Sequence, residues 1–323
     1  MPKTVPADTW QNLFYPPPTY QYFDGAERFG FDPAGQQFSW TNAWWMADAA
    51  LLAYVKDWNC VKAILTAPGR FDEAEQIGAD PAKSTKGYVA LRGGAKPCAV
   101  VAYRGTDKDD KRNAETDIDI VPLDRGGYIV HRGFGEALDL VWDSEVRPAL
   151  DAFLAAHAGA PVFFTGHSLG AALATISAAQ FAGQCSLYTI GSPRCGDSRF
   201  VKAVLAKAKV VGRFVNGDEI VTQIPTPPVY QHVGDAIYID RTGVVRESIS
   251  DLGKTLDVFR GSTAHDGAAA VLALGHPLVY FKKVMGDALV GNPPDPPPYI
   301  VGQHTPARYA VHIWNHLEGL GGA

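Results

Sequence analysis

Ser168 is the residue of this sequence best placed to act as a nucleophile, because it stands between two glycines in the stretch GHSLG, residues 166–170. An apolar run, residues 161–165, leads directly into this stretch, and an alanine-rich segment, residues 171–180, follows it. This pattern is typical of a strand that turns sharply into a helix and exposes the serine hydroxyl at the edge of a sheet. The helix N-terminus favours the negative charge that develops during attack. The sequence therefore predicts an activated serine rather than an ordinary helix-capping serine.

Such a serine needs a base, and the base needs a carboxylate that holds its tautomer. In this arrangement the three residues follow one another along the chain as Ser, then Asp or Glu, then His. We favour His304 as the base, because it stands in the polar stretch GQHTPARY just before the last predicted helix. His265 in STAHDG is the rival, whereas His276 lies in an apolar run and is expected to be buried. His167 is expected to pack beside the site.

The elements that position these residues alternate between apolar strands and helices, which predicts a mostly parallel sheet with helices on both faces. Strands that end in polar loops are expected within residues 98–106, 161–165, 186–194 and 210–219. Amphipathic helices are expected at residues 42–55, with Asn42 as the cap, and across residues 133–156. Because parallel strands end at one edge of a sheet, the polar loops should meet there.

Composition excludes several classes of partner. The 323 residues carry a net charge of −5 and no cluster of Lys and Arg, so we expect no nucleic-acid partner. The longest apolar stretch, residues 268–281, is short for a membrane span and predicts no stable membrane insertion. Four scattered cysteines are expected to be free, Cys185 and Cys195 being the pair to check. Their spacing fits no zinc site, and we expect neither a metal nor a cofactor.

Residues 1–20 contain no apolar run followed by a small-residue cleavage site. Because a secretory signal peptide has both features, we expect no classical signal peptide here. The expectation is a cytoplasmic protein, or one exported by a non-classical route.

Six collinear stretches resemble the class 3 (fungal-type) lipases of the α/β-hydrolase superfamily, in a bacterial-looking form. They cover roughly residues 98–240 and the C-terminal tail, and they are VVAYRGT, VHRGFGEAL, FFTGHSLGAALAT, LYTIGSPRCGD, RFVNGDEIVTQIP and QHTPARY. The resemblance implies an α/β-hydrolase fold, with a mostly parallel sheet flanked by helices. We expect one domain over residues 1–323. Residues 241–300 would form a helical insertion before the catalytic histidine, either a cap over the acyl pocket or a scaffold on the flank of the sheet.

The resemblance also implies the hydrolysis of acyl esters through an acyl-enzyme, as a lipase or an esterase. Ser168 would be the nucleophile and His304 the base. The backbone N–H groups of Leu169 and Thr106 would form the oxyanion hole, in agreement with the need of acyl transfer for donors aimed at the developing charge. The expected partner is a small-molecule or lipid ester, and the oligomeric state is left open.

The acid departs from the family pattern. The family usually has an Asp directly before an Ile-Val pair, whereas this chain has Glu219 there and Asp218 one position earlier. The alignment favours Glu219, whose side chain is one methylene longer and has to fold back toward the base. Asp218 stays open as the alternative acid.

A second departure lies at residues 107–117, where lipases of the family often carry an apolar lid helix. Here Ala114 is the single apolar residue, so this loop is predicted not to open onto lipid. Two other functions remain open. One is a catalytically silent, lipase-like protein that binds acyl ligands or partner proteins, and the other is a thioesterase or peptidase that uses the same triad.

Overall fold

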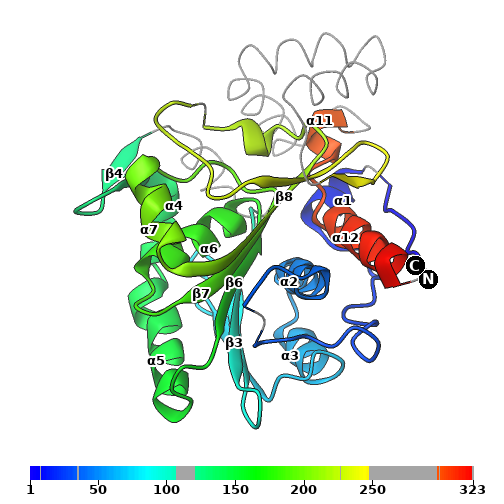
Figure 1. Cartoon of the computed structure of the whole chain (residues 1–323), viewed down its shortest axis with the longest axis horizontal. Helices are drawn as coiled ribbons and strands as arrows, with labels where there is room; N and C mark the ends of the chain where they lie inside the picture. Colours follow the sequence, from blue (N-terminus) through cyan, green and yellow to red (C-terminus); the bar gives the residue numbers. More distant parts are fainter. Residues whose placement is uncertain are drawn as a thin grey trace.

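A sheet of eight strands, with helices on both faces, forms the centre of the described part of the chain (Figure 1). The computed structural model describes residues 1–7, 9–34, 36–106, 121–225, 227–246, 297 and 299–321. In spatial order the strands are β1 (Glu73–Ile77), β2 (Gly87–Arg92), β3 (Cys98–Tyr103), β6 (Val162–His167), β7 (Cys185–Ile190), β8 (Ala208–Asn216), β9 (Ala236–Ile239) and β10 (Val245–Arg246). A separate two-stranded sheet pairs β4 (Pro122–Asp124) with β5 (Ile129–His131).

The five neighbouring strands from β3 to β9 in this order run parallel, and β1, β2 and β10 add antiparallel edges. The prediction of a mostly parallel sheet is therefore confirmed. Every residue of β3, β6 and β7 is buried, as expected of strands that are covered on both faces. The carboxyl ends of β3, β6, β7 and β8 consequently share one edge of the sheet.

Helices from distant parts of the sequence cover the two faces (Figure 1). One face carries α2 (Trp40–Leu52), α3 (Trp58–Thr66) and α12 (Pro306–Gly321). The other carries α4 (Arg132–Asp139), a π-helical turn (Trp142–Val146), α5 (Arg147–Ala156), α6 (Leu169–Gln180) and α7 (Ser198–Leu205). Three short elements complete the described helices, namely α1 (Trp10–Phe14), a 3-10 turn (Val221–Gln223) and α11 (Tyr299–Gly302).

The local prediction for α2 was wrong in two respects. The N-cap is Ser39, whose hydroxyl accepts from the backbone N–H of Asn42. The Asn42 side chain instead bonds the backbone N–H and C=O of Asp32. The helix is also buried all round rather than amphipathic, because α12 and the sheet both pack against it. The predicted helix over residues 133–156 is divided by the π-helical turn.

A small third cluster of buried side chains lies apart from the two large cores. It joins Leu13 of α1 to Ile220 and Val221, and to Ile300 and Val301 of α11. The backbone N–H of Ile220 donates to the carbonyl of Ile300 at 3.1 Å. The segments that precede His304 and follow Glu219 are thus packed together, with α1 against both.

Two predictions fall largely on residues outside the described ranges. The polar segment 107–117 is one, and most of the expected insertion at 241–300 is the other, so one domain over residues 1–323 stays a prediction. The four cysteines are free thiols, as the sequence predicts. No helix among the described residues is long and apolar enough to span a membrane.

Candidate active site

Ser168 occupies a strained turn between β6 and α6. Its backbone has φ 59° and ψ −127°, a left-handed conformation that is uncommon for residues with a side chain. The flanking glycines make the turn feasible, because a Cβ on Gly166 would overlap the carbonyl of Gly170, and one on Gly170 would overlap that of Tyr103. The Ser168 N–H donates to the carbonyl of Ile190 at 3.0 Å, which ties the turn to the end of β7. The local geometry is that of the sharp strand-to-helix turn that the sequence predicts, known as a nucleophile elbow.

His304 and Glu219 form a buried hydrogen-bonded pair, in which Nδ1 of His304 donates to Oε2 of Glu219. The Glu219 side chain is fully buried and His304 nearly so. The other ring nitrogen of His304, Nε2, is buried and has no hydrogen-bond partner among the described residues. The pair lies against Gly191 at the end of β7, where a Cβ would come within 2.9 Å of both side chains. One imidazole nitrogen is thus held by a carboxylate, and the other is left for a reacting group.

Burial controls the protonation of this pair. It lowers the pKa of His304 to about 3, so the ring is neutral and Nε2 carries a lone pair. Burial likewise raises the pKa of Glu219 well above its ordinary value, and a hydrogen bond from Tyr309 opposes that rise. Because both Tyr309 and His304 donate to the carboxyl group, they favour its ionised form.

Tyr309 is a residue of the site that the sequence did not reveal. Its hydroxyl, fully buried on α12, donates to Oε1 of Glu219 and accepts the backbone N–H of Asn216 at 2.8 Å. A buried tyrosine hydroxyl usually finds a partner, so a tyrosine on a core-facing position was the available signal. Tyr309 holds the second carboxylate oxygen of the longer glutamate.

Replacing Tyr309 with phenylalanine tests that role. The change leaves the Asn216 N–H without its acceptor, so unfolding free energy should fall by about 1–3 kcal/mol in chemical denaturation. Loss of a bond that lowers the Glu219 pKa should raise that pKa, which moves the acidic limb of the activity profile to higher pH. Turnover should fall roughly tenfold, the equivalent of about 1.4 kcal/mol of transition-state stabilisation. An unchanged pH profile would contradict this role.

The remaining predicted residues lie at the same edge of the sheet. Leu169 is the first residue of α6, and Thr106 follows the end of β3. Gly105, next to Thr106, comes so close to the elbow that a Cβ on it would be 3.0 Å from the Cβ of Ser168. Asp218 lies on the turn before Glu219 and is half-buried, whereas Nδ1 of His304 is bonded by Glu219. The rival base His265 lies outside the described residues, and so does His276, which the sequence predicts to be buried.

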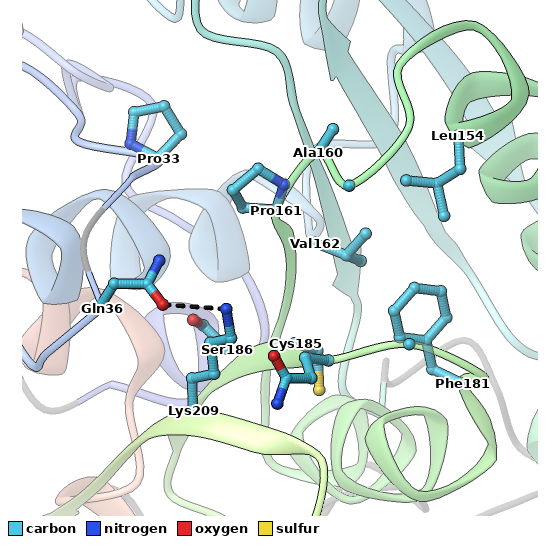
Figure 2. A pocket seen from close by; sticks show the side chains of 13 residues that line it. Pro33, Gln36, Leu154, Ala160, Pro161, Val162, Phe181, Cys185, Ser186 and Lys209 are labelled. Carbon is cyan, nitrogen blue, oxygen red and sulfur yellow. Dashed lines mark hydrogen bonds between the residues drawn. The ribbon is translucent and has the colours of Figure 1, made fainter.

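A cavity of about 340 Å³ lies at the opposite, amino-terminal edge of the sheet (Figure 2). Its lining includes the first residues of β6 and β7, Val162 and Cys185, and Lys209 near the start of β8. Lys209 donates to the side-chain oxygen of Gln36 at 2.9 Å, and both side chains line the cavity (Figure 2). The length of the strands separates this cavity from Ser168, so it takes no part in the chemistry described above.

Residues 100–229 match the family described as lipase (class 3). A secreted mono- and diacylglycerol lipase from Fusarium solani is 30% identical over 52% of this chain and 51% of its own length, so the chain spans about half of that relative. A secreted mono- and diacylglycerol lipase from Penicillium cyclopium is 27% identical over 69% of this chain and 76% of its own length.

Solved structures show the same fold. The mono- and diacylglycerol lipase from Aspergillus oryzae superposes with a TM-score of 0.52 at 24% identity, covering 67% of this chain and 84% of that one. A triacylglycerol lipase whose catalytic centre is described as a serine protease triad gives 0.52 at 23% identity, covering 67% and 88%. The expectation of an α/β-hydrolase fold is confirmed.

The predicted location was wrong. The relatives include proteins named as secreted lipases, which points to export rather than to a cytoplasmic protein. The prediction took the missing signal-peptide pattern in residues 1–20 as evidence of location. A missing pattern does not show where a protein acts. The relatives named above come from fungi, and the bacterial look of the sequence stays a prediction.

Proposed function

We propose that this chain, which belongs to the class 3 lipases through residues 100–229, hydrolyses carboxylic esters of lipids by way of an acyl-enzyme. The observation that carries the proposal is the His304–Glu219 pair beside a strained serine elbow. A neutral imidazole, held at Nδ1 by a carboxylate and free at Nε2, is the form that accepts a proton from a serine hydroxyl.

The proposed reaction has two halves. Nε2 of His304 takes the proton of the Ser168 hydroxyl as Oγ attacks the ester carbonyl, and the Glu219 carboxylate stabilises the imidazolium. The N–H groups of Leu169 and Thr106 donate to the oxyanion, and the imidazolium then protonates the departing alcohol. Water, activated by the same imidazole, releases the acid from Ser168 and restores the resting site.

Acylglycerols are the proposed substrate class. Residues 100–229 match the class 3 lipases, relatives of this chain are named for mono- and diacylglycerols, and a structural neighbour is named for triacylglycerols. Export suits such substrates, since they also occur outside cells. The proposed reaction calls for no metal or cofactor and uses the side chains and backbone N–H groups named above.

A hydrolysis profile tests the reaction class. We expect turnover of p-nitrophenyl esters within the series from acetate to palmitate, with amide and thioester analogues of the best substrate hydrolysed more slowly. The Ser168→Ala variant provides the blank, because it keeps the fold and lacks the hydroxyl. Ester hydrolysis no faster than this blank would remove the proposal, and a preference for the amide or thioester would replace it with a peptidase or a thioesterase.

The response to an oil surface is a separate prediction. A lid that opens at such a surface gains roughly 25 cal/mol for each Å² of apolar area buried in lipid, and charged side chains gain nothing. Residues 107–117 are almost entirely charged and polar, so the rate on a short-chain ester should rise smoothly through its solubility limit. A sharp increase when droplets form would refute the prediction. Deleting the apolar run at 271–281 would then show whether the segment 241–300 acts as the lid.

A further inference from the structure

His167 is a buried imidazole that the proposed reaction does not use. Its Nε2 lies 2.8 Å from the carbonyl oxygen of His304, and its Nδ1 lies 2.7 Å from the hydroxyl of Tyr54. A carbonyl oxygen only accepts, so Nε2 of His167 carries a proton. Burial lowers the pKa of His167 well below its ordinary value and keeps the ring neutral. Nδ1 is therefore an acceptor, and the Tyr54 hydroxyl donates to it.

The ring of His167 also sets the surroundings of the base. Its centroid lies 4.4 Å from that of the His304 ring, with 34° between the two planes. His304 lies in the loop of residues 303–305 between α11 and α12, here called the base loop. The preceding carbonyl in this loop, that of Gln303, accepts from the side-chain amide of Asn216 at 2.8 Å. Two consecutive carbonyls of this loop are thus held by buried side chains. One is His167, from the turn at residues 166–170 (the nucleophile turn), and the other is Asn216, at the end of β8. Their hydrogen bonds fix the backbone that carries the His304 ring.

Tyr54 extends the same contacts to a third loop. It follows α2 and is buried, and its hydroxyl lies so close to Gly105 that a Cβ on Gly105 would overlap it. The same Cβ would be 2.7 Å from the His167 carbonyl. Gly105 precedes Thr106, whose N–H is the proposed donor to the oxyanion, and residues 104–106 are here called the oxyanion loop. One tyrosine and one histidine therefore contact the nucleophile turn, the oxyanion loop and the base loop.

We propose that Tyr54 and His167 form a positioning pair that holds the base loop and the oxyanion loop in register with the nucleophile turn. This inference rests on the proposed function, since it assigns the pair to the same site. Neither side chain touches the reacting atoms in this scheme, so the pair acts through His304 and Gly105. Its loss should lower kcat and leave KM nearly unchanged, because the geometry of the chemical step is disturbed and substrate binding is not.

Three variants test the proposal by the hydrolysis of a p-nitrophenyl ester. His167→Leu removes the donor to the His304 carbonyl and should lower kcat about 100-fold, the cost expected of a displacement of about 1 Å in the catalytic groups. His167→Gln places an amide N–H where Nε2 stands and should recover most of that loss. Tyr54→Phe removes a single oxygen and keeps the ring. Its kcat should lie between those of the two His167 variants.

Tyr88→Phe is the matched control. The Tyr88 hydroxyl is also buried, and it donates to the carbonyl of Ala49 at 2.8 Å on α2, so the variant loses the same kind of bond. It should lose stability without losing kcat per folded molecule. Parental kcat in both His167→Leu and Tyr54→Phe, or no recovery in His167→Gln, would overturn the positioning role. If His167→Leu does not fold, Tyr54→Phe decides the matter.

A spectroscopic measurement separates this proposal from the proposed function. The proton that Nδ1 of His304 shares with Glu219 should give a downfield proton resonance, which Glu219→Gln assigns by removing it. We expect Tyr54→Phe and His167→Leu to shift this resonance, whatever the enzyme hydrolyses, and Tyr88→Phe to leave it in place. A shift in a protein without esterase activity would remove the proposed function alone. Active wild-type enzyme, with kcat and resonance unchanged in both variants, would remove the positioning pair alone.

Discussion

Ser168→Ala should abolish ester hydrolysis while leaving the melting temperature nearly unchanged. The expected loss in kcat is on the order of 10⁶-fold, as for other enzymes whose nucleophilic serine is removed. The fold should tolerate the change, because the Ser168 hydroxyl makes no capping hydrogen bond to α6 and is only half-buried. Alanine meets the same φ of 59°, so the strain of the turn is the same in both proteins.

The control for this variant is Ser177→Ala, on the same helix. Its hydroxyl is fully buried and pairs with that of Tyr103 at 2.8 Å, so its loss should affect stability and spare turnover. The comparison measures kcat and melting temperature for the wild type, Ser168→Ala and Ser177→Ala. Wild-type turnover in Ser168→Ala would end the assignment of Ser168 as the nucleophile.

Glu219→Gln should have the second-largest effect, about 10⁴-fold in kcat. An amide in place of the carboxylate can donate to Nδ1 of His304, which then keeps its proton on Nε2 and loses the lone pair that accepts the serine proton. The amide also gives less stabilisation to the imidazolium. The side chain is nearly isosteric, so circular dichroism should show a folded protein, and steady-state kinetics measure the loss.

Asp218→Asn is the matched comparison, since it makes the same chemical change one residue earlier. We expect a much milder effect, because the bond to Nδ1 of His304 comes from Glu219. The reverse ranking would move the acid to Asp218. For the base, His304→Ala should be inactive and His265→Ala active, and the opposite outcome would move that role to His265.

The sequence predicted the nucleophile more sharply than the acid. The reason is how far along the sequence the residues that determine each of them lie. The turn at Ser168 depends on glycines within two residues of it and on the flanking strand and helix, all of them visible locally. The case for Glu219 over Asp218 draws in part on Tyr309, which is 90 residues away in the sequence and bonds the Glu219 carboxyl group from another helix. No local pattern carries that information.

The helix cap shows the same limit. Asn42 was the predicted cap, although Ser39 also has a side chain suited to capping. The choice is made by the loop at Asp32, which takes both polar groups of Asn42 into its own hydrogen bonds and leaves the cap to Ser39. The roles of Tyr54 and His167 were equally hidden, because they follow from contacts among loops that only the folded chain brings together.

The cluster of Leu13, Ile220, Val221, Ile300 and Val301 should open at a lower temperature than the two large cores. Among the described residues it is much smaller than either main core, and regions with few buried apolar contacts open at a lower free energy than the whole protein. Opening it would release α1 and loosen the connection between the segments that carry Glu219 and His304, while the sheet stays intact. We therefore expect heat inactivation to begin as a local event in this cluster, at a temperature below the one at which the sheet melts.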